Sequence, residues 1–161
     1  MPTNRLIQPK TLDDMLLYQL WGLQAAAGRM VVRLCETEFG ISRREWRVLA
    51  QLARHEGLSS SALAERASLD RAQTSRAIGR LAAKRLLTRA PRQGNRREVL
   101  LHLTDEGRAV HAALLPRVAS INREVLSVLN EAEAAELERL LHHLRQQADR
   151  MVAGTQEQPQ R

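Results

Sequence analysis

The hydrophobic positions between residues 12 and 38 recur every three or four residues, which predicts one long helix. They form two stripes on different faces of that helix. The first stripe is Leu12, Leu16, Leu20, Leu23, Ala27, Met30 and Leu34, and the second is Tyr18, Trp21, Ala25, Gly28 and Val32. A helix with two apolar faces needs cover from two sides, and we expect a second subunit to supply one of them.

Local signals mark the end of the long helix and the start of the next. Gly40 suits a left-handed C-cap at the end of the long helix. Ser42 and Glu45 stand three residues apart, which is the spacing of a capping box. These signals predict a second helix that begins just after Ser42.

Two helices separated by a tight turn follow. Ser59 is the expected N-cap of a helix over 60–67, and Asp70 caps the next helix after a break at 68–70. The inward face of that next helix carries Thr74, Ala77, Ile78 and Leu81, and its outward face carries Ala72, Gln73, Arg76 and Arg80. The arrangement is like a helix-turn-helix, whose second helix enters the major groove of DNA.

A β-hairpin is predicted after these helices. Its first strand covers 86–90, Gly94 and Asn95 signal the turn, and the second strand covers 97–103. Along the second strand, alternate residues are apolar: Val99, Leu101 and Leu103. The sequence therefore predicts a two-stranded arm with a basic tip.

The rest of the chain is predicted to be helical except at its end. Thr104 is the expected N-cap of a helix, and a final helix covers about 132–151. Residues 152–161 are polar and are expected to form a disordered tail. The predicted fold class is mainly α with a small β-hairpin.

Positive charge is concentrated in the helix-turn-helix and the hairpin. The whole chain has a formal net charge of +7. Segment 66–97 holds ten basic residues and one acid, Asp70, and thus nine net positive charges. The remainder is slightly acidic. A basic patch confined to such a segment is the electrostatic footprint of a DNA-binding element.

Several other classes of protein are disfavoured. No apolar run reaches the roughly 20 residues of a membrane span, and the single cysteine, Cys35, fits a reducing cytoplasm. Hydrolase, phosphate-loop and zinc-protease motifs are missing from the sequence, so we expect that the protein is not an enzyme. The adjacent residues His142 and His143 point about 100° apart on a helix, so they cannot easily bind one metal ion. We therefore expect neither a metal site nor a cofactor.

An ordered set of short motifs runs along the chain. It comprises Glu45-Trp46-Arg47-Val48-Leu49, Leu63-Ala64-Glu65-Arg66, Leu69-Asp70-Arg71, Leu81 to Arg89, Arg96-Arg97 and Leu103-Thr104-Asp105-Glu106-Gly107-Arg108. In this order, the set resembles the MarR family of bacterial transcription regulators. The resemblance implies a winged helix-turn-helix fold in an interleaved helical homodimer.

The resemblance also implies how the chain is organised and what it does. Residues 1–38 and 104–151 would form a helical dimerisation region, and 39–103 a DNA-binding lobe. Family members usually repress genes by covering a pseudo-palindromic operator. Many release the DNA when a small aromatic or heteroaromatic acid binds. The implied partners are operator DNA, a second copy of the chain and such an acid.

The residues expected to contact DNA lie mainly on the helix-turn-helix. The set on these helices is Ser59, Ser61, Arg71, Gln73, Thr74, Ser75, Arg76 and Arg80. Gln73 and Arg76 are expected to read base edges, because glutamine suits adenine and arginine suits guanine. Thr74 is a weaker candidate because it shares the inward face. The two serines of the first helix and Arg71 are expected to contact phosphates.

The hairpin, or wing, carries further candidates and one of two departures from the family. Arg96 is expected to enter the minor groove, and Arg97 to brace the wing or touch the DNA backbone. Asn95 stands where the family usually has an aspartate that orients the wing, so we expect a more positive wing. Arg85 replaces a family glycine after the recognition helix. If the backbone is left-handed there, arginine costs about 1–2 kcal/mol.

A sensor site is a further expectation from the resemblance. Tyr18 and Trp46 are candidate walls of a ligand pocket, Arg43 or Arg47 could neutralise a carboxylate, and His111 could add a polar contact. The alternative is that the aromatic residues are helix core. Two other functions also stay open: a constitutive DNA-binding regulator or antirepressor with no ligand, and a scaffold that binds an acidic protein.

Overall fold

A computed structural model describes residues 4–156, apart from the side chains at 96, 97, 155 and 156. Two compact units, residues 1–121 and 122–161, divide the chain, and each is described by itself. The elements are η1 (Leu12–Asp14), α1 (Leu16–Phe39), α2 (Arg43–Arg54), α3 (Ser60–Ala67), α4 (Arg71–Ala83), β1 (Leu87–Arg92), β2 (Asn95–Leu103), α5 (Asp105–Leu126) and α6 (Glu131–Gln156). The mainly α class with one two-stranded hairpin is confirmed.

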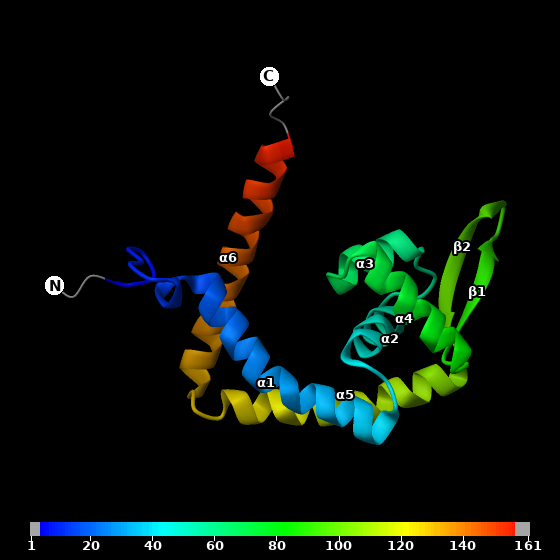
Figure 1. The fold of residues 1–161 in the computed structure, drawn as a ribbon, viewed down its shortest axis with the longest axis horizontal. Helices are drawn as coiled ribbons and strands as arrows, with labels where there is room; N and C mark the ends of the chain where they lie inside the picture. Colours follow the sequence, from blue (N-terminus) through cyan, green and yellow to red (C-terminus); the bar gives the residue numbers. More distant parts are fainter. Residues whose placement is uncertain (1–3, 157–161) are drawn as a thin grey trace. The chain divides into compact units, whose positions relative to one another are not determined.

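The core of the first unit lies where α2, α3 and α4 meet the hairpin (Figure 1). Its fully buried leucines include Leu49 and Leu52 of α2, Leu63 of α3 and Leu81 of α4. Each such side chain stabilises the fold by about 1.5–3 kcal/mol relative to an exposed one. This core therefore fixes the helix-turn-helix as a rigid lobe.

The predicted caps form where the sequence places them. Gly40 has φ of 61°, and it ends α1 in the left-handed conformation. The Ser42 backbone N–H donates to Glu45 Oε2 at 2.5 Å, and the Glu45 N–H donates to Ser42 Oγ at 3.2 Å, so the capping box is confirmed. Ser59 and Asp70 cap α3 and α4 as expected.

Left-handed residues flank α4 at both ends. Ser68 has φ of 49° and Arg85 has φ of 58°, and both occur in Schellman turns. After α4, Leu86 N–H donates to the Leu81 carbonyl at 2.9 Å and Arg85 N–H donates to the Ala82 carbonyl at 3.0 Å. The position of Arg85 therefore requires the backbone that its glycine counterpart adopts easily, and the expected steric cost applies.

Helix α5 packs tightly against the turn that follows α4. Thr104 Oγ1 accepts from the Gly107 N–H at 2.9 Å, as predicted, and donates to the Arg85 carbonyl at 2.7 Å. A Cβ on Gly107 would lie 1.9 Å from the Leu86 carbonyl oxygen. Only glycine fits at this contact, which joins the end of α4 to the start of α5.

The hairpin is longer than the sequence suggested. Strand β1 ends at Arg92 and β2 begins at Asn95, so the turn is only two residues long, with Gly94 at φ of 81°. The register pairs Leu87 with Leu103 and is irregular between Pro91 and Arg92. Of the three alternating apolar residues, Leu101 and Leu103 are buried, whereas Val99 lies nearer the tip and is 47% exposed.

The second unit contains the end of α5 and all of α6. Asn130 and Glu133 cap α6 reciprocally, with both bonds at 2.9 Å. The helix continues to Gln156, so residues 152–156 are helical and the prediction of a disordered tail was wrong for them. Residues 157–161 lie outside the described part of the chain. None of the described helices is long and apolar enough to cross a membrane.

Replacing Arg85 by glycine should raise the free energy of unfolding by about 0.5–1 kcal/mol. Glycine removes the left-handed strain, although its greater freedom in the unfolded chain offsets part of the gain. Urea unfolding of Arg85→Gly against the parent protein measures the difference. Ala83→Gly is the matched control, because it places glycine in the helix proper and should cost about 1 kcal/mol. A loss of stability in Arg85→Gly would contradict the strain.

Candidate nucleic-acid interface

The outward face of α4 presents the predicted reading side chains to solvent. Arg71, Ser75, Arg76 and Arg80 are exposed, and Gln73 is partly exposed. Asp70 fixes the start of the helix, because its Oδ1 accepts from the Gln73 backbone N–H at 2.6 Å. The first turn of α4 therefore carries exposed polar side chains that a DNA groove could receive.

Thr74 is placed differently from that set. Its side chain is 0% exposed, and its Oγ1 donates to the Asp70 carbonyl oxygen at 2.8 Å. A buried hydroxyl that is already hydrogen-bonded cannot reach a base without unfolding the turn. This burial argues against the expected contact of Thr74 with DNA, and the bond to Asp70 stabilises the first turn of α4.

The predicted serines lie at the beginning of α3. Ser59 Oγ accepts from the Ala62 N–H at 3.3 Å and lies 3.2 Å from Ser61 Oγ. Ser61 is exposed, whereas Ser59 is partly buried by its capping role. Together they leave hydroxyl groups and free helix N–H groups at the surface, a combination that suits phosphate.

A basic groove that sequence reasoning missed lies between α4 and the start of α2. It has a volume of about 320 Å³ and is lined by Ser42, Arg44, Gln73, Arg76, Ala77 and Arg80. A signal for Arg44 was available in the sequence. Arginines in the first turn of a helix oppose its dipole, so their presence points to a role other than stability.

The side chains of Arg96 and Arg97 lie outside the described residues, although their backbone belongs to β2. Near them, Arg92 Nη1 donates to Glu98 Oε2 at 2.9 Å across the hairpin. Asn95 begins β2 opposite Arg92 in the strand register. The wing thus contains an arginine–carboxylate pair even though asparagine replaces the family's aspartate.

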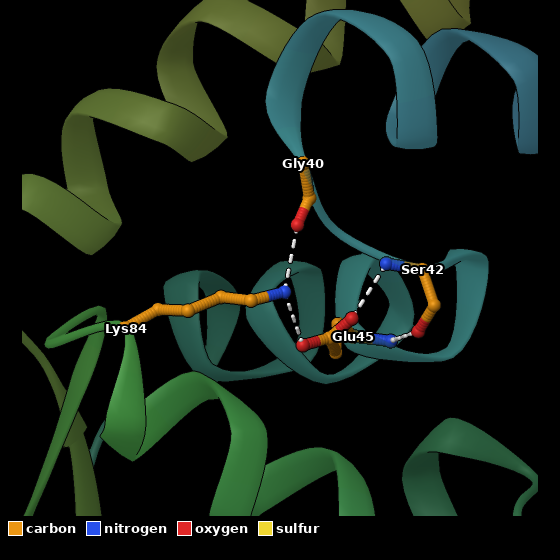
Figure 2. Close-up of polar contacts among 4 residues, drawn as sticks. All are labelled: Gly40, Ser42, Glu45 and Lys84. Carbon is orange, nitrogen blue, oxygen red and sulfur yellow. Dashed lines mark hydrogen bonds and ion pairs between the residues drawn. The ribbon is translucent and has the colours of Figure 1, made fainter.

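The C-terminal end of α4 is held by an ion pair between the exposed Lys84 and the buried Glu45 (Figure 2). Lys84 Nζ donates to Glu45 Oε1 at 2.8 Å and to the Gly40 carbonyl oxygen at 2.7 Å. Glu45 is 2% exposed. Burial raises the pKa of Glu45, but the bonds from Lys84 and Ser42 outweigh it and leave this pKa below its ordinary value. The carboxylate therefore stays charged and joins α1, α2 and α4.

Arg47 of α2 holds the end of α3 and the turn that leads into α4. Its Nη2 donates to the carbonyl oxygens of Ala67 and Ser68, the latter at 3.1 Å. These carbonyls end α3 and precede the turn into α4. Burial, together with the charges of Arg43 and Arg44, lowers the pKa of Arg47. Side chains of α2 thus bind the C-terminal end of α4 and the turn that precedes α4.

Comparison with known proteins identifies the fold. Residues 39–98 match the model of the MarR family. A relative from Thauera aromatica, assigned as the transcriptional regulatory protein for the hcr operon, is 30% identical over 134 residues, covering 83% of this chain and 81% of that protein. The chain belongs to the MarR family. It is therefore a transcriptional regulator, a class of protein without enzymatic activity.

Other MarR-family relatives agree with this assignment. The transcriptional repressor MdtR of Bacillus subtilis is 28% identical over 142 residues, covering 87% of this chain and 92% of that protein. A crystal structure of the PcaV regulator from Streptomyces coelicolor in complex with its natural ligand is 28% identical, with a TM-score of 0.71, covering 86% of this chain and 96% of that one. The hairpin is the wing of this winged helix fold.

In this MarR-family chain, the predicted ligand residues lie in three separate places. Tyr18 stacks on the neighbouring Trp21 of α1, with ring centroids 5.6 Å apart. Trp46 is buried and stacks on His111 of α5 at 5.5 Å, and burial lowers the pKa of this histidine. Arg43 and Arg47 line a different cavity between α1 and α2. The cavity that Arg43 and Arg47 line does not include Tyr18, Trp46 or His111.

Replacing Lys84 by methionine should lower the free energy of unfolding by about 2 kcal/mol at pH 7, because it leaves a buried carboxylate without its cation. A carboxyl with a lowered pKa stabilises the fold above its ordinary pKa and loses this contribution as the pH falls through the lowered value. The difference between Lys84→Met and the parent should therefore shrink on acidification below about pH 4, as measured by urea unfolding.

The control for this prediction is Arg139→Met, which breaks an exposed ion pair with Glu136 on α6. That change should cost less than about 0.5 kcal/mol. Equal costs in the two variants, or a Lys84→Met cost that does not change between pH 7 and pH 3, would show that the Lys84–Glu45 pair has no special role in stability.

Proposed function

We propose that the protein binds a pseudo-palindromic DNA operator as a homodimer and represses the genes beside it. The observation that carries the proposal is the exposed face of α4, which α2 binds at its C-terminal end and at the turn before it, within a segment of nine net positive charges. A rigid helix with exposed donors suits insertion into the major groove. The net charge supplies the salt-dependent part of the affinity.

Specific roles follow from the exposed side chains. Gln73 reads adenine and Arg76 reads guanine, since these pairings are bidentate in the major groove. Phosphates are contacted by Arg71, Arg80 and the serines at the start of α3 and on α4, and Arg44 is added to this group. Arg96 enters the minor groove, and Arg97 braces the wing or touches the DNA backbone.

The exposed apolar surface of two helices supports a homodimer. On α1, Leu17 is 79% exposed and Trp21 is 61% exposed. On α6, Leu140, Leu141 and Leu144 are each more than 40% exposed. Apolar stripes of this kind mark protein interfaces, and a second copy of the chain would cover both. Two-fold symmetry would then present two α4 helices to two half-sites, with 1–38 and 104–151 as the dimerisation region.

A small aromatic or heteroaromatic acid is the proposed signal for release. The PcaV structure holds a natural ligand, and in this chain Trp46 of α2 stacks on His111 of α5. Trp46 also belongs to the helix that binds the end of α4 and the turn before it. A constitutive regulator without a ligand is the rival function, and it predicts that no aromatic acid changes operator affinity.

Arg76→Ala and Gln73→Ala should each weaken operator binding by about 5- to 150-fold and relax the preference at one base position. Each loss removes one bidentate contact. Fluorescence anisotropy with operators carrying single base changes measures both effects. Arg33→Ala removes an exposed arginine of α1 and is the charge-matched control. If Arg76→Ala loses affinity equally for every sequence, Arg76 contacts phosphate instead of a base.

Trp46 fluorescence should report binding of an aromatic acid. In Trp21→Phe the remaining tryptophan is Trp46, so saturable quenching by benzoate or nicotinate is expected in this variant. In Trp46→Phe, where only Trp21 remains, the same acids should have no saturable effect. If quenching occurs only in Trp46→Phe, the acid binds near Trp21 on the surface of α1 instead. If quenching occurs in neither variant, the constitutive regulator is favoured.

A further inference from the structure

A cavity of about 290 Å³ lies between α3, α4 and the wing. Its polar lining residues are all exposed, and they are Ser60 of α3, Ser75 of α4 and Arg89 of β1. The rest of the lining is an apolar wall, formed by Ile78, Val99 and Leu101. Cationic and hydroxyl donors beside an apolar wall suit a ligand in which an anionic group is attached to a carbon ring.

Arg89 lies on the face of the wing that packs against the core. In the strand register it stands opposite Leu101, and directly opposed residues of an antiparallel pair share one face. Leu101 and Leu87, its neighbours on that face, are each 2% exposed. The alternation of the strand therefore favours an apolar side chain where Arg89 stands. Within the described part of the chain, no carboxylate pairs with Arg89.

Two serine hydroxyls beside Arg89 are also available to a ligand. Neither Ser60 nor Ser75 uses its hydroxyl in a hydrogen bond to another described residue. The neighbouring Ser59 differs, because its hydroxyl caps α3. A guanidinium and two hydroxyls match the oxygens of a phosphate, which are strong hydrogen-bond acceptors.

This cavity and the basic groove lie on opposite flanks of α4. Four residues of α4 line the basic groove: Gln73, Arg76, Ala77 and Arg80. Ser75 and Ile78 line the cavity. At about 100° per residue, the two sets are centred about 180° apart around the helix. A helix in the major groove has one phosphate backbone on each side, so the cavity lies on the flank that faces the second backbone.

We propose that the cavity between α3, α4 and the wing binds one phosphate of the operator backbone together with its deoxyribose. Arg89, Ser60 and Ser75 donate to the phosphate, and the apolar wall packs against the carbon atoms of the sugar. A ribose would place its 2′-hydroxyl against that wall without a partner, so the contact also favours DNA over RNA. The inference rests on the proposed function, because it names a contact within that DNA complex.

Methylphosphonates, which are uncharged, locate the phosphate when they replace one backbone position at a time in a duplex that the parent protein selects from random DNA. At one position in each half-site, the replacement should weaken parent binding about tenfold, the size of a hydrogen bond to a charged group. The same replacement should have little further effect on Arg89→Ala. Arg54→Ala removes an exposed arginine of α2 and should keep the parent profile. If every position has the same effect on Arg89→Ala as on the parent, the proposal is overturned.

The effect of Arg89→Ala on the unmodified duplex separates this contact from a purely structural role. Loss of a phosphate contact should weaken binding to all sequences alike and reduce the slope of log K against log salt by about 1, with an unchanged Tm. An inward charge can also protect an edge strand from pairing with another chain. That role predicts aggregation of Arg89→Ala with unchanged operator affinity, and this result would overturn the contact.

A single modified sugar tests the apolar wall. At the nucleotide located above, a 2′-hydroxyl should weaken binding several-fold more than a 2′-fluoro group, which favours the same sugar pucker without needing a hydrogen bond. The difference should shrink in Val99→Thr, which keeps the shape of valine and offers a hydroxyl partner. Equal effects of the two sugars would refute the sugar contact. If the parent protein selects no duplex at all, the proposed function fails and this contact with it, whereas tight binding that ignores Arg89 refutes the contact alone.

Discussion

Beyond the packing of its buried face in the core, α4 is tied to its neighbours by three hydrogen bonds that side chains of α2 make. Glu45 of α2 holds the end of α4 through Lys84, and Arg47 of α2 holds the turn before α4 through two carbonyl oxygens. Glu45 and Arg47 lie two residues apart in the same helix. Any shift of α2 is therefore transmitted to the end of the helix that we propose reads DNA and to the turn before it, and α2 also faces the α1–α2 cavity.

Several features of the chain lower the stability of the fold, and the proposed binding of DNA gives a reason for them. Arg85 occupies a left-handed position, and Arg43 and Arg44 place cations at the start of α2. Buried charge such as Glu45 is costly unless it is fully paired, and here Ser42 and Lys84 supply the partners. Positive charge is thus retained where it weakens the fold but strengthens attraction to phosphates or other anions.

The sequence predicted what short-range chemistry determines. Gly40, Ser42, Ser59, Asp70 and Thr104 act as caps where their side chains or backbone freedom require. Contacts between distant residues escaped prediction, because nothing in the local pattern encodes them. Lys84 reaches Glu45 across 39 positions and Arg47 reaches Ala67 across 20. For the same reason, the sequence grouped Arg47 with ligand residues. The inward position of Thr74 was different, because the local pattern already indicated it.

Selection of binding sites from a random DNA library tests the central claim most directly. The account predicts a two-fold symmetric sequence whose half-sites lie about 10 base pairs apart, centre to centre, and whose selection depends on the outward face of α4. Arg76→Ala should then select sequences that differ at one position in each half-site. Recovery of sequences without symmetry, or of the same sequences by Arg76→Ala, would contradict the account.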